Sequence, residues 1–269
     1  MIISLVRGIT LLISRPFMLV PAIIASIFNL GLIAISISTI LDFANSILLL
    51  NYIPDSGLEN LPFQFYSMYA DSINLILILL FASIVSGYWL LFVYCKYIND
   101  AAKKNAGLAK STVYGFKNLK KIIGLSILSI AILLFFATAG WFVLILSMGF
   151  GIIGTILVAV LSLLIAYCGI KLVFVPTIMG ADGVSFKDAL KKSWEFSGKR
   201  FFRIIFLLLA LGVIGFFINS IGTSLASYFN ESQEIFYIGT VLIFMIIATA
   251  YSNVALIIYY LKKEHNLLP

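Results

Sequence analysis

Long apolar runs separated by short polar segments make up most of this chain of 269 residues. A helix needs about 20 apolar residues to cross the hydrocarbon of a bilayer, and the chain has several runs of that length. The run from Ile122 to Val175 is too long for one crossing at about 1.5 Å per residue, so we expect a turn at Gly149, Gly151 and Gly154. The sequence therefore predicts an all-α polytopic membrane protein, one domain over 1–269 with a bundle of six transmembrane helices at about 17–41, 71–94, 122–147, 153–176, 204–228 and 236–261.

The segments between these runs differ in character. Residues 42–70 contain the turn signal Pro54-Asp55-Ser56-Gly57 and are about half apolar, so we expect them on the outer membrane surface. Residues 95–121 and 177–203 are basic, and in these inner loops we expect interfacial amphipathic helices on the cytoplasmic side. A serine followed four residues later by a small residue precedes each pair of runs, which predicts an inner helix plus a hairpin, three times over: Ser4/Gly8, Ser111/Gly115 and Ser185/Ala189.

Composition excludes a soluble domain. Hydrophobic residues make up 62% of the chain and charged residues 11%, whereas soluble domains contain about 45–50% apolar and 25% charged residues. The net charge of +7 is explained by membrane topology, so we expect no nucleic-acid partner.

Charge is distributed asymmetrically about the predicted spans. Every lysine and arginine falls on one side, and the opposite side carries only the acids Asp42, Asp55, Glu59, Asp71, Glu231 and Glu234. Because basic residues resist translocation, we expect a cell-membrane protein whose N- and C-termini both lie in the cytoplasm. The tripeptide Asn230-Glu231-Ser232 on the outer side has the pattern of a glycosylation acceptor, although such tripeptides also arise by chance.

The inner segment after the fourth run contains the strongest local pattern. Ser185 and Asp188 form a capping-box pattern, Gly198 is a candidate C-terminal cap, and Trp194 is expected at headgroup level. Its basic residues form a candidate surface for lipids or protein partners: Lys187, Lys191, Lys192, Lys199, Arg200 and Arg203. The alternative is that this helix is only a structural corner between two spans.

Few polar groups lie within the spans. Lys171 is close to an inner boundary, so we expect it to snorkel to the interface, the alternative being contact with a substrate or a lipid headgroup. Asn29, Asn219 and Asn253 either hydrogen-bond between helices or line a conduit. The absence of carboxylates inside the spans argues against a proton-coupled pump.

No chemistry-bearing constellation is visible in the sequence. His265 is the one histidine, and Cys95 and Cys168 lack metal-ligand spacing. We therefore expect no catalytic residues, no metal site and no cofactor.

The string from Pro176 through Ser185, Ala189, Leu190, Ser193 and Trp194 to Gly198 resembles the signature of a group of six-span proteins, and Tyr259-Tyr260-Leu261-Lys262 fits it too. The group includes the membrane domain found beside glycerophosphodiester phosphodiesterases, with bacterial and archaeal relatives. The resemblance implies a six-span membrane module of unassigned biochemical role. It does not imply hydrolase activity, because we expect the catalytic domain to be absent from this chain.

Three functional hypotheses follow. The first is a non-enzymatic integral membrane module that scaffolds protein partners or organises lipid at the cytoplasmic leaflet. The second is a small transporter or channel, and the third is an accessory subunit of a larger membrane complex. Membrane lipids and a membrane-protein partner are the expected ligands, and the sequence gives no oligomeric state.

Overall fold

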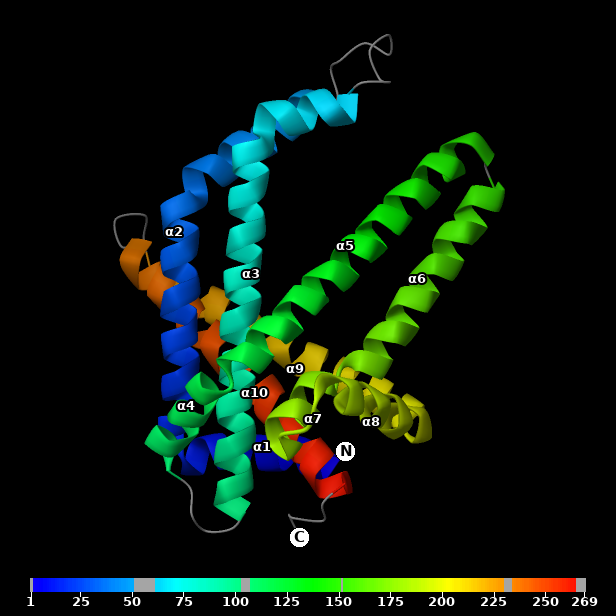
Figure 1. Cartoon of the computed structure of the whole chain (residues 1–269). Helices are drawn as coiled ribbons and strands as arrows, with labels where there is room; N and C mark the ends of the chain where they lie inside the picture. The colour runs from blue at the N-terminus through cyan, green and yellow to red at the C-terminus, as the bar shows by residue number, and fades with distance from the viewer. Residues whose placement is uncertain (1, 51–60, 103–106, 151, 230–233, 265–269) are drawn as a thin grey trace. The chain divides into compact units, whose positions relative to one another are not determined.

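The structure, a computed structural model, describes residues 2–50, 61–102, 107–150, 152–229 and 234–264. Within these ranges the chain is all-α, as the sequence predicts, and no strand occurs. In chain order the helices are α1 (Ile2–Ser14), the short 3-10 helix η1 (Pro16–Met18), α2 (Leu19–Leu50), α3 (Leu61–Ala102), α4 (Leu108–Lys117), α5 (Leu119–Phe150), α6 (Ile152–Leu172), α7 (Val175–Asp182), α8 (Phe186–Lys199), α9 (Phe201–Ala226) and α10 (Glu234–Glu264) (Figure 1).

Helix length and apolar composition confirm a polytopic membrane protein. Five of the described helical segments are long and apolar enough to cross a membrane. A sixth crossing is added if α1 and the helical segment that begins at Pro16 are counted as one broken span, and these two meet at a bend of 101°.

Two predicted connections are more helical than expected. α2 continues to Leu50 and α3 begins at Leu61, so much of the predicted outer segment 42–70 is helical, and residues 51–60 lie outside the described part of the chain. The prediction that 95–121 is a loop is also wrong at its start. α3 runs on to Ala102 because Cys95 and Ile98 in its last turns are buried.

The described chain forms two compact units. One consists of residues 24–87, in which the hydroxyl of Ser86 donates a 2.9 Å hydrogen bond to Oδ1 of Asn29 and so links α2 to α3. The other consists of residues 1–23 and 88–269 and contains the rest of the helices.

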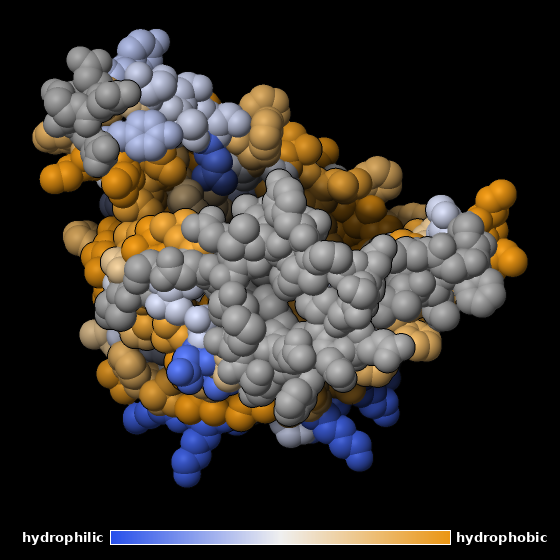
Figure 2. Space-filling model, turned by 90° about the horizontal axis from the view of Figure 1, so that it is seen from above, coloured by the Kyte–Doolittle hydropathy of each residue, from blue (hydrophilic) through white to orange (hydrophobic). Residues whose placement is uncertain are grey.

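The core of this second unit lies where its helices carry their basic residues. Its largest fully buried side chains come from the end of α3, the start of α7 and the end of α10, among them Tyr94, Phe92, Phe174, Tyr259 and Tyr260. Away from this core the long helices expose apolar side chains, which colour much of the surface in Figure 2 orange. Such exposure is costly in water and expected against lipid.

Three short helices each precede a pair of long ones: α1, α4 and α8. Each buries small residues against the second long helix of a pair: α1 against α10, α4 against α3 and α8 against α6. A Cβ on Gly8 of α1 would lie 3.2 Å from the Tyr251 ring of α10, and a Cβ on Gly115 of α4 would lie 2.8 Å from Val93 of α3. α8 packs on α6, and Ser193 is buried there.

The structure corrects the register predicted for the third copy of this repeat. The buried pairs are Ser4/Gly8 on α1, Ser111/Gly115 on α4 and Ser193/Ser197 on α8. The predicted pair Ser185/Ala189 does not match, because Ser185 is the exposed residue that caps the N-terminus of α8.

Candidate functional site

Local interactions define both ends of the α7–α8 corner. α7 ends at Gly183, whose φ of 69° lies in the left-handed region that favours glycine. The hydroxyl of Ser185 accepts a 3.3 Å hydrogen bond from the main-chain N–H of Asp188 and donates at 2.6 Å to Oδ2 of that residue. The N-terminal cap predicted at Ser185 is therefore confirmed, and Asp188 closes the pair through the Ser185 hydroxyl instead of the main-chain N–H that a capping box uses.

The predicted cap at Gly198 is wrong. α8 continues through Lys199, and Arg200 is its C-cap. Gly198 lies inside the last turn, where an added Cβ would be 3.0 Å from Nζ of Lys171. The small residue at this position therefore makes room for a neighbouring side chain.

The inner face of α8 packs on protein. Ala189, Ser193, Phe196 and Ser197 are buried, and α8 contacts α6, α7 and α9. Trp194, which the sequence places on the apolar face, is 45% exposed. These contacts support the interpretation of α8 as a structural corner, and they leave its outer face to carry the charge.

The six basic residues predicted for this segment fall into two groups. Lys192 and Arg200 are engaged: Lys192 Nζ lies 2.9 Å from Oδ2 of Asp182, and the Arg200 guanidinium lies 4.4 Å from the centroid of the Phe196 ring. The other four are exposed and form no salt bridge with any described residue: Lys187, Lys191, Lys199 and Arg203.

Asp182 joins three helices at this corner. It ends α7, accepts from Lys192 of α8, and accepts a 2.9 Å hydrogen bond from the hydroxyl of Tyr260 on α10. The hydrogen bond to Asp182 is the main reason that the pKa of Lys192 is raised above its usual value. The ion pair of Lys192 with Asp182 therefore stabilises this junction, whereas the four exposed cations stay available to external anions.

Lys171, which we expect to snorkel to the membrane interface, is only 6% exposed, so protein surrounds its ammonium group. Nζ lies 5.0 Å from the centroid of the Trp194 ring and 5.3 Å from that of Tyr167. Two cation–π contacts take the place of solvent, which makes Lys171 a packing residue of the α6–α8 junction.

Of the three amides, Asn29 belongs to one compact unit, and Asn219 and Asn253 belong to the other. Asn29 is bonded to Ser86 within residues 24–87, as expected for a contact between helices. Asn219 is exposed on α9, and Asn253 is half-buried on α10. Because Gly222 packs on Phe244, the helix rise places Asn219 and Asn253 roughly 9 Å apart in depth.

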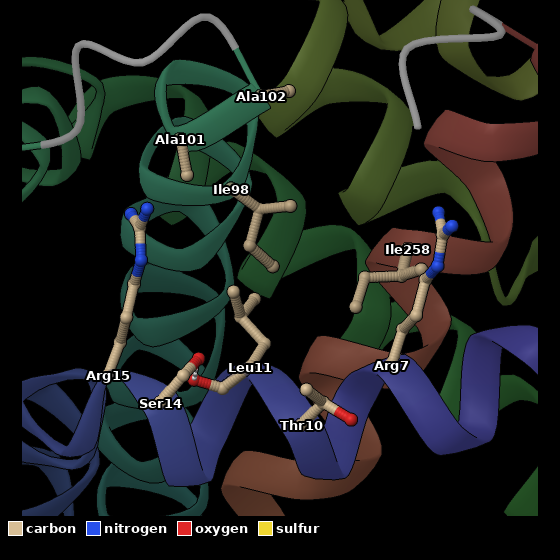
Figure 3. Close-up of a pocket in the computed structure, with 9 residues that line it drawn as sticks. All are labelled: Arg7, Thr10, Leu11, Ser14, Arg15, Ile98, Ala101, Ala102 and Ile258. Atoms are coloured by element: carbon tan, nitrogen blue, oxygen red, sulfur yellow. Dashed lines mark hydrogen bonds between the residues drawn. The ribbon is translucent and has the colours of Figure 1, made fainter. Parts of the chain in front are cut away.

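A pocket of about 300 Å³ is the feature that the sequence reasoning missed. It lies between α1, the last turns of α3 and the end of α10, and Figure 3 shows Arg7 and Arg15 at the two ends of a row on α1. The full lining is Arg7, Thr10, Leu11, Ser14, Arg15, Ile98, Ala101, Ala102 and Ile258. The sequence does indicate one wall of the pocket, because the helical spacing of residues 7, 10, 11 and 14 places them on one face of α1.

Comparison with known proteins supports the resemblance noted from the sequence. Residues 142–266 match the family model described as the membrane domain of glycerophosphoryl diester phosphodiesterase. The match runs from the end of α5 to the end of α10 and includes the α7–α8 corner. No curated protein and no solved structure matches the chain.

Proposed function

We propose that this integral membrane module is non-enzymatic and organises anionic lipid at the cytoplasmic leaflet of the cell membrane, with both termini in the cytoplasm. The observation that carries the proposal is a set of four exposed cations on and after α8 that form no salt bridge with a described residue: Lys187, Lys191, Lys199 and Arg203. Each basic group near an anionic leaflet contributes about 1 kcal/mol of attraction.

The packing of α8 supports this role. A helix capped by Ser185 and fixed to α10 through Asp182 has little freedom, so its outward charges keep a constant position. A fixed array attracts anions without the entropy loss that a mobile loop would suffer on binding. An acidic protein surface would meet the same charges, and scaffolding of such a partner is the second use that this surface supports.

The placement of the amides does not favour the transporter or channel hypothesis. Asn219 and Asn253 are absent from the linings of three pockets among the described residues. Asn29 uses its side-chain oxygen in a contact between α2 and α3.

Reconstitution into nanodiscs of mixed zwitterionic and anionic lipid tests the lipid proposal. Native mass spectrometry would count the anionic lipids that stay bound to the wild type and to a Lys187→Gln/Lys191→Gln variant. The matched control is Lys117→Gln/Lys120→Gln, which removes the same charge from other exposed positions. The proposal requires a several-fold loss of anionic lipid in the α8 variant and little loss in the control. Equal retention in all three proteins would contradict it.

A further inference from the structure

We propose that the pocket lined by Arg7 and Arg15 binds the phosphate group of a lipid headgroup or of a small soluble phosphate. The inference rests on the proposed lipid-organising role and adds a discrete site to it. The α8 surface attracts anions without fixed stoichiometry, whereas this open pocket offers about 300 Å³ with two arginines in its lining.

The charge of the pocket is positive and uncompensated. Among its lining residues Arg7 and Arg15 are the ionisable ones, and neither guanidinium forms a salt bridge with a described carboxylate. Asp100, on the same turns of α3, is engaged by Lys96 at 2.9 Å and Lys110 at 3.9 Å. A guanidinium offers five N–H donors in a planar fork that fits phosphate oxygens two at a time.

The arginines hold their position by different means. Arg15 follows α1 directly, and its guanidinium lies 5.9 Å from the centroid of the Tyr97 ring. Arg7 is half-buried, and both guanidinium groups extend to the same side of α1 in Figure 3. Between them the hydroxyls of Thr10 and Ser14 donate to carbonyls of their own helix, and each would exchange that bond for one to an incoming oxygen.

The other faces of α1 place this pocket at headgroup depth. Ser4 and Gly8 are buried, with Gly8 packed against α10. Ile2, Val6, Ile9 and Ile13 follow helical spacing on a third face and are all exposed, from 46% to 76%. An exposed apolar stripe beside an arginine-bearing stripe is the pattern of a helix that lies at the membrane interface, with cations among the phosphates. Ile98, Ala101 and Ile258 supply an apolar wall suited to the carbon atoms next to a phosphate.

Saturable binding to detergent-purified protein tests the site. The probe is short-chain phosphatidylglycerol, measured by native mass spectrometry, with inorganic phosphate as a competitor. We expect one tightly bound lipid per chain and at least a 10-fold weaker affinity in Arg7→Gln/Arg15→Gln. Ala101→Leu keeps both charges but fills the pocket, and it should weaken binding as well. Lys117→Gln/Lys120→Gln is the charge-matched control and should bind like the wild type.

The outcomes distinguish a lipid headgroup from a soluble phosphate, and they distinguish the pocket proposal from the α8 proposal. Displacement of the lipid by phosphate assigns the site to a phosphate group from any source, and lack of displacement assigns it to the lipid headgroup. Wild-type affinity in both pocket variants overturns the site, as does equal weakening in the control. Because Lys187→Gln/Lys191→Gln leaves the pocket intact, it should keep the single tight lipid. A failure of the α8 proposal would therefore show in the nanodisc counts alone.

Discussion

The side-chain hydroxyl of Ser193 donates a 2.6 Å hydrogen bond to the main-chain carbonyl oxygen of Lys171, and so joins α8 to the last turn of α6. Carbonyls in the last turn of a helix lack a partner within that helix and need one from elsewhere. Ser193 is fully buried and small, so it provides that partner and lets α8 approach closely. The position of the α8 charges depends on this contact.

Replacing Ser193 with alanine should lower the free energy of unfolding by about 1–3 kcal/mol, because a buried carbonyl loses its donor. Equilibrium unfolding in detergent measures the change. Thr223→Ala is the control, since the Thr223 hydroxyl is exposed and bonds only within α9. An equal loss of unfolding free energy in both variants would show that the hydrogen bond from Ser193 to Lys171 does not stabilise the protein.

Gly222 is required for the contact between α9 and α10. A Cβ there would lie 2.5 Å from Cβ of Phe244, so Gly222→Ala should destabilise the protein by about 1–3 kcal/mol through overpacking. Gly212 is on the same helix, and a Cβ added to it would have no atom of another helix within 4 Å. Gly212→Ala should change the unfolding free energy by no more than about 1 kcal/mol. Thermal denaturation of the two variants distinguishes them, and a stable Gly222→Ala protein would refute the close packing.

Lys171 and Trp194 should be energetically coupled. A double-mutant cycle with Lys171→Met and Trp194→Ala should give a coupling energy of about 0.5–2 kcal/mol for the cation–π contact. Trp141 is 68% exposed on α5 and should show no coupling to Lys171 in the same cycle. Additive effects of Lys171→Met and Trp194→Ala would mean that the burial of Lys171 has another cause.

Sidedness is tested by single cysteines at Ser56 and Lys110. A membrane-impermeant maleimide should label position 56 in intact cells and position 110 only after the membrane is permeabilised. The side chain of Lys110 is 67% exposed, so only the membrane should keep the maleimide from a cysteine at this position. The parent protein with Cys95 and Cys168 gives the background. The reverse labelling pattern would invert the topology and separate the α8 charges from the cytoplasmic leaflet.

Features that depend on local sequence were predicted well. The apolar runs gave helices at the expected places, because a span is defined by composition over about 20 residues. The cap at Ser185 was predicted because its two partners are three residues apart. The sequence could not show that α2 and α3 extend well past their apolar runs, since backbone hydrogen bonding continues a helix until something ends it.

Features that depend on contacts between distant segments were missed. Gly198 resembled a cap, yet its role is to accommodate Lys171 from a different helix. The repeat was found with the right helices and the wrong register in α8, because Ser185/Ala189 and Ser193/Ser197 fit the same spacing. The Arg7–Arg15 pocket needs walls from α3 and α10, and no pattern within α1 shows them.

Extraction of the protein from native membranes into polymer-bounded discs, with mass spectrometry of everything retained, would show whether the protein organises anionic lipid. We expect anionic phospholipid to be enriched over the surrounding membrane in the wild type and in Lys117→Gln/Lys120→Gln. We expect this enrichment to fall in Lys187→Gln/Lys191→Gln, with no protein retained in stoichiometric amount. Lipid of bulk composition around all three proteins, together with a stoichiometric protein partner, would contradict a lipid-organising role and identify an accessory subunit instead.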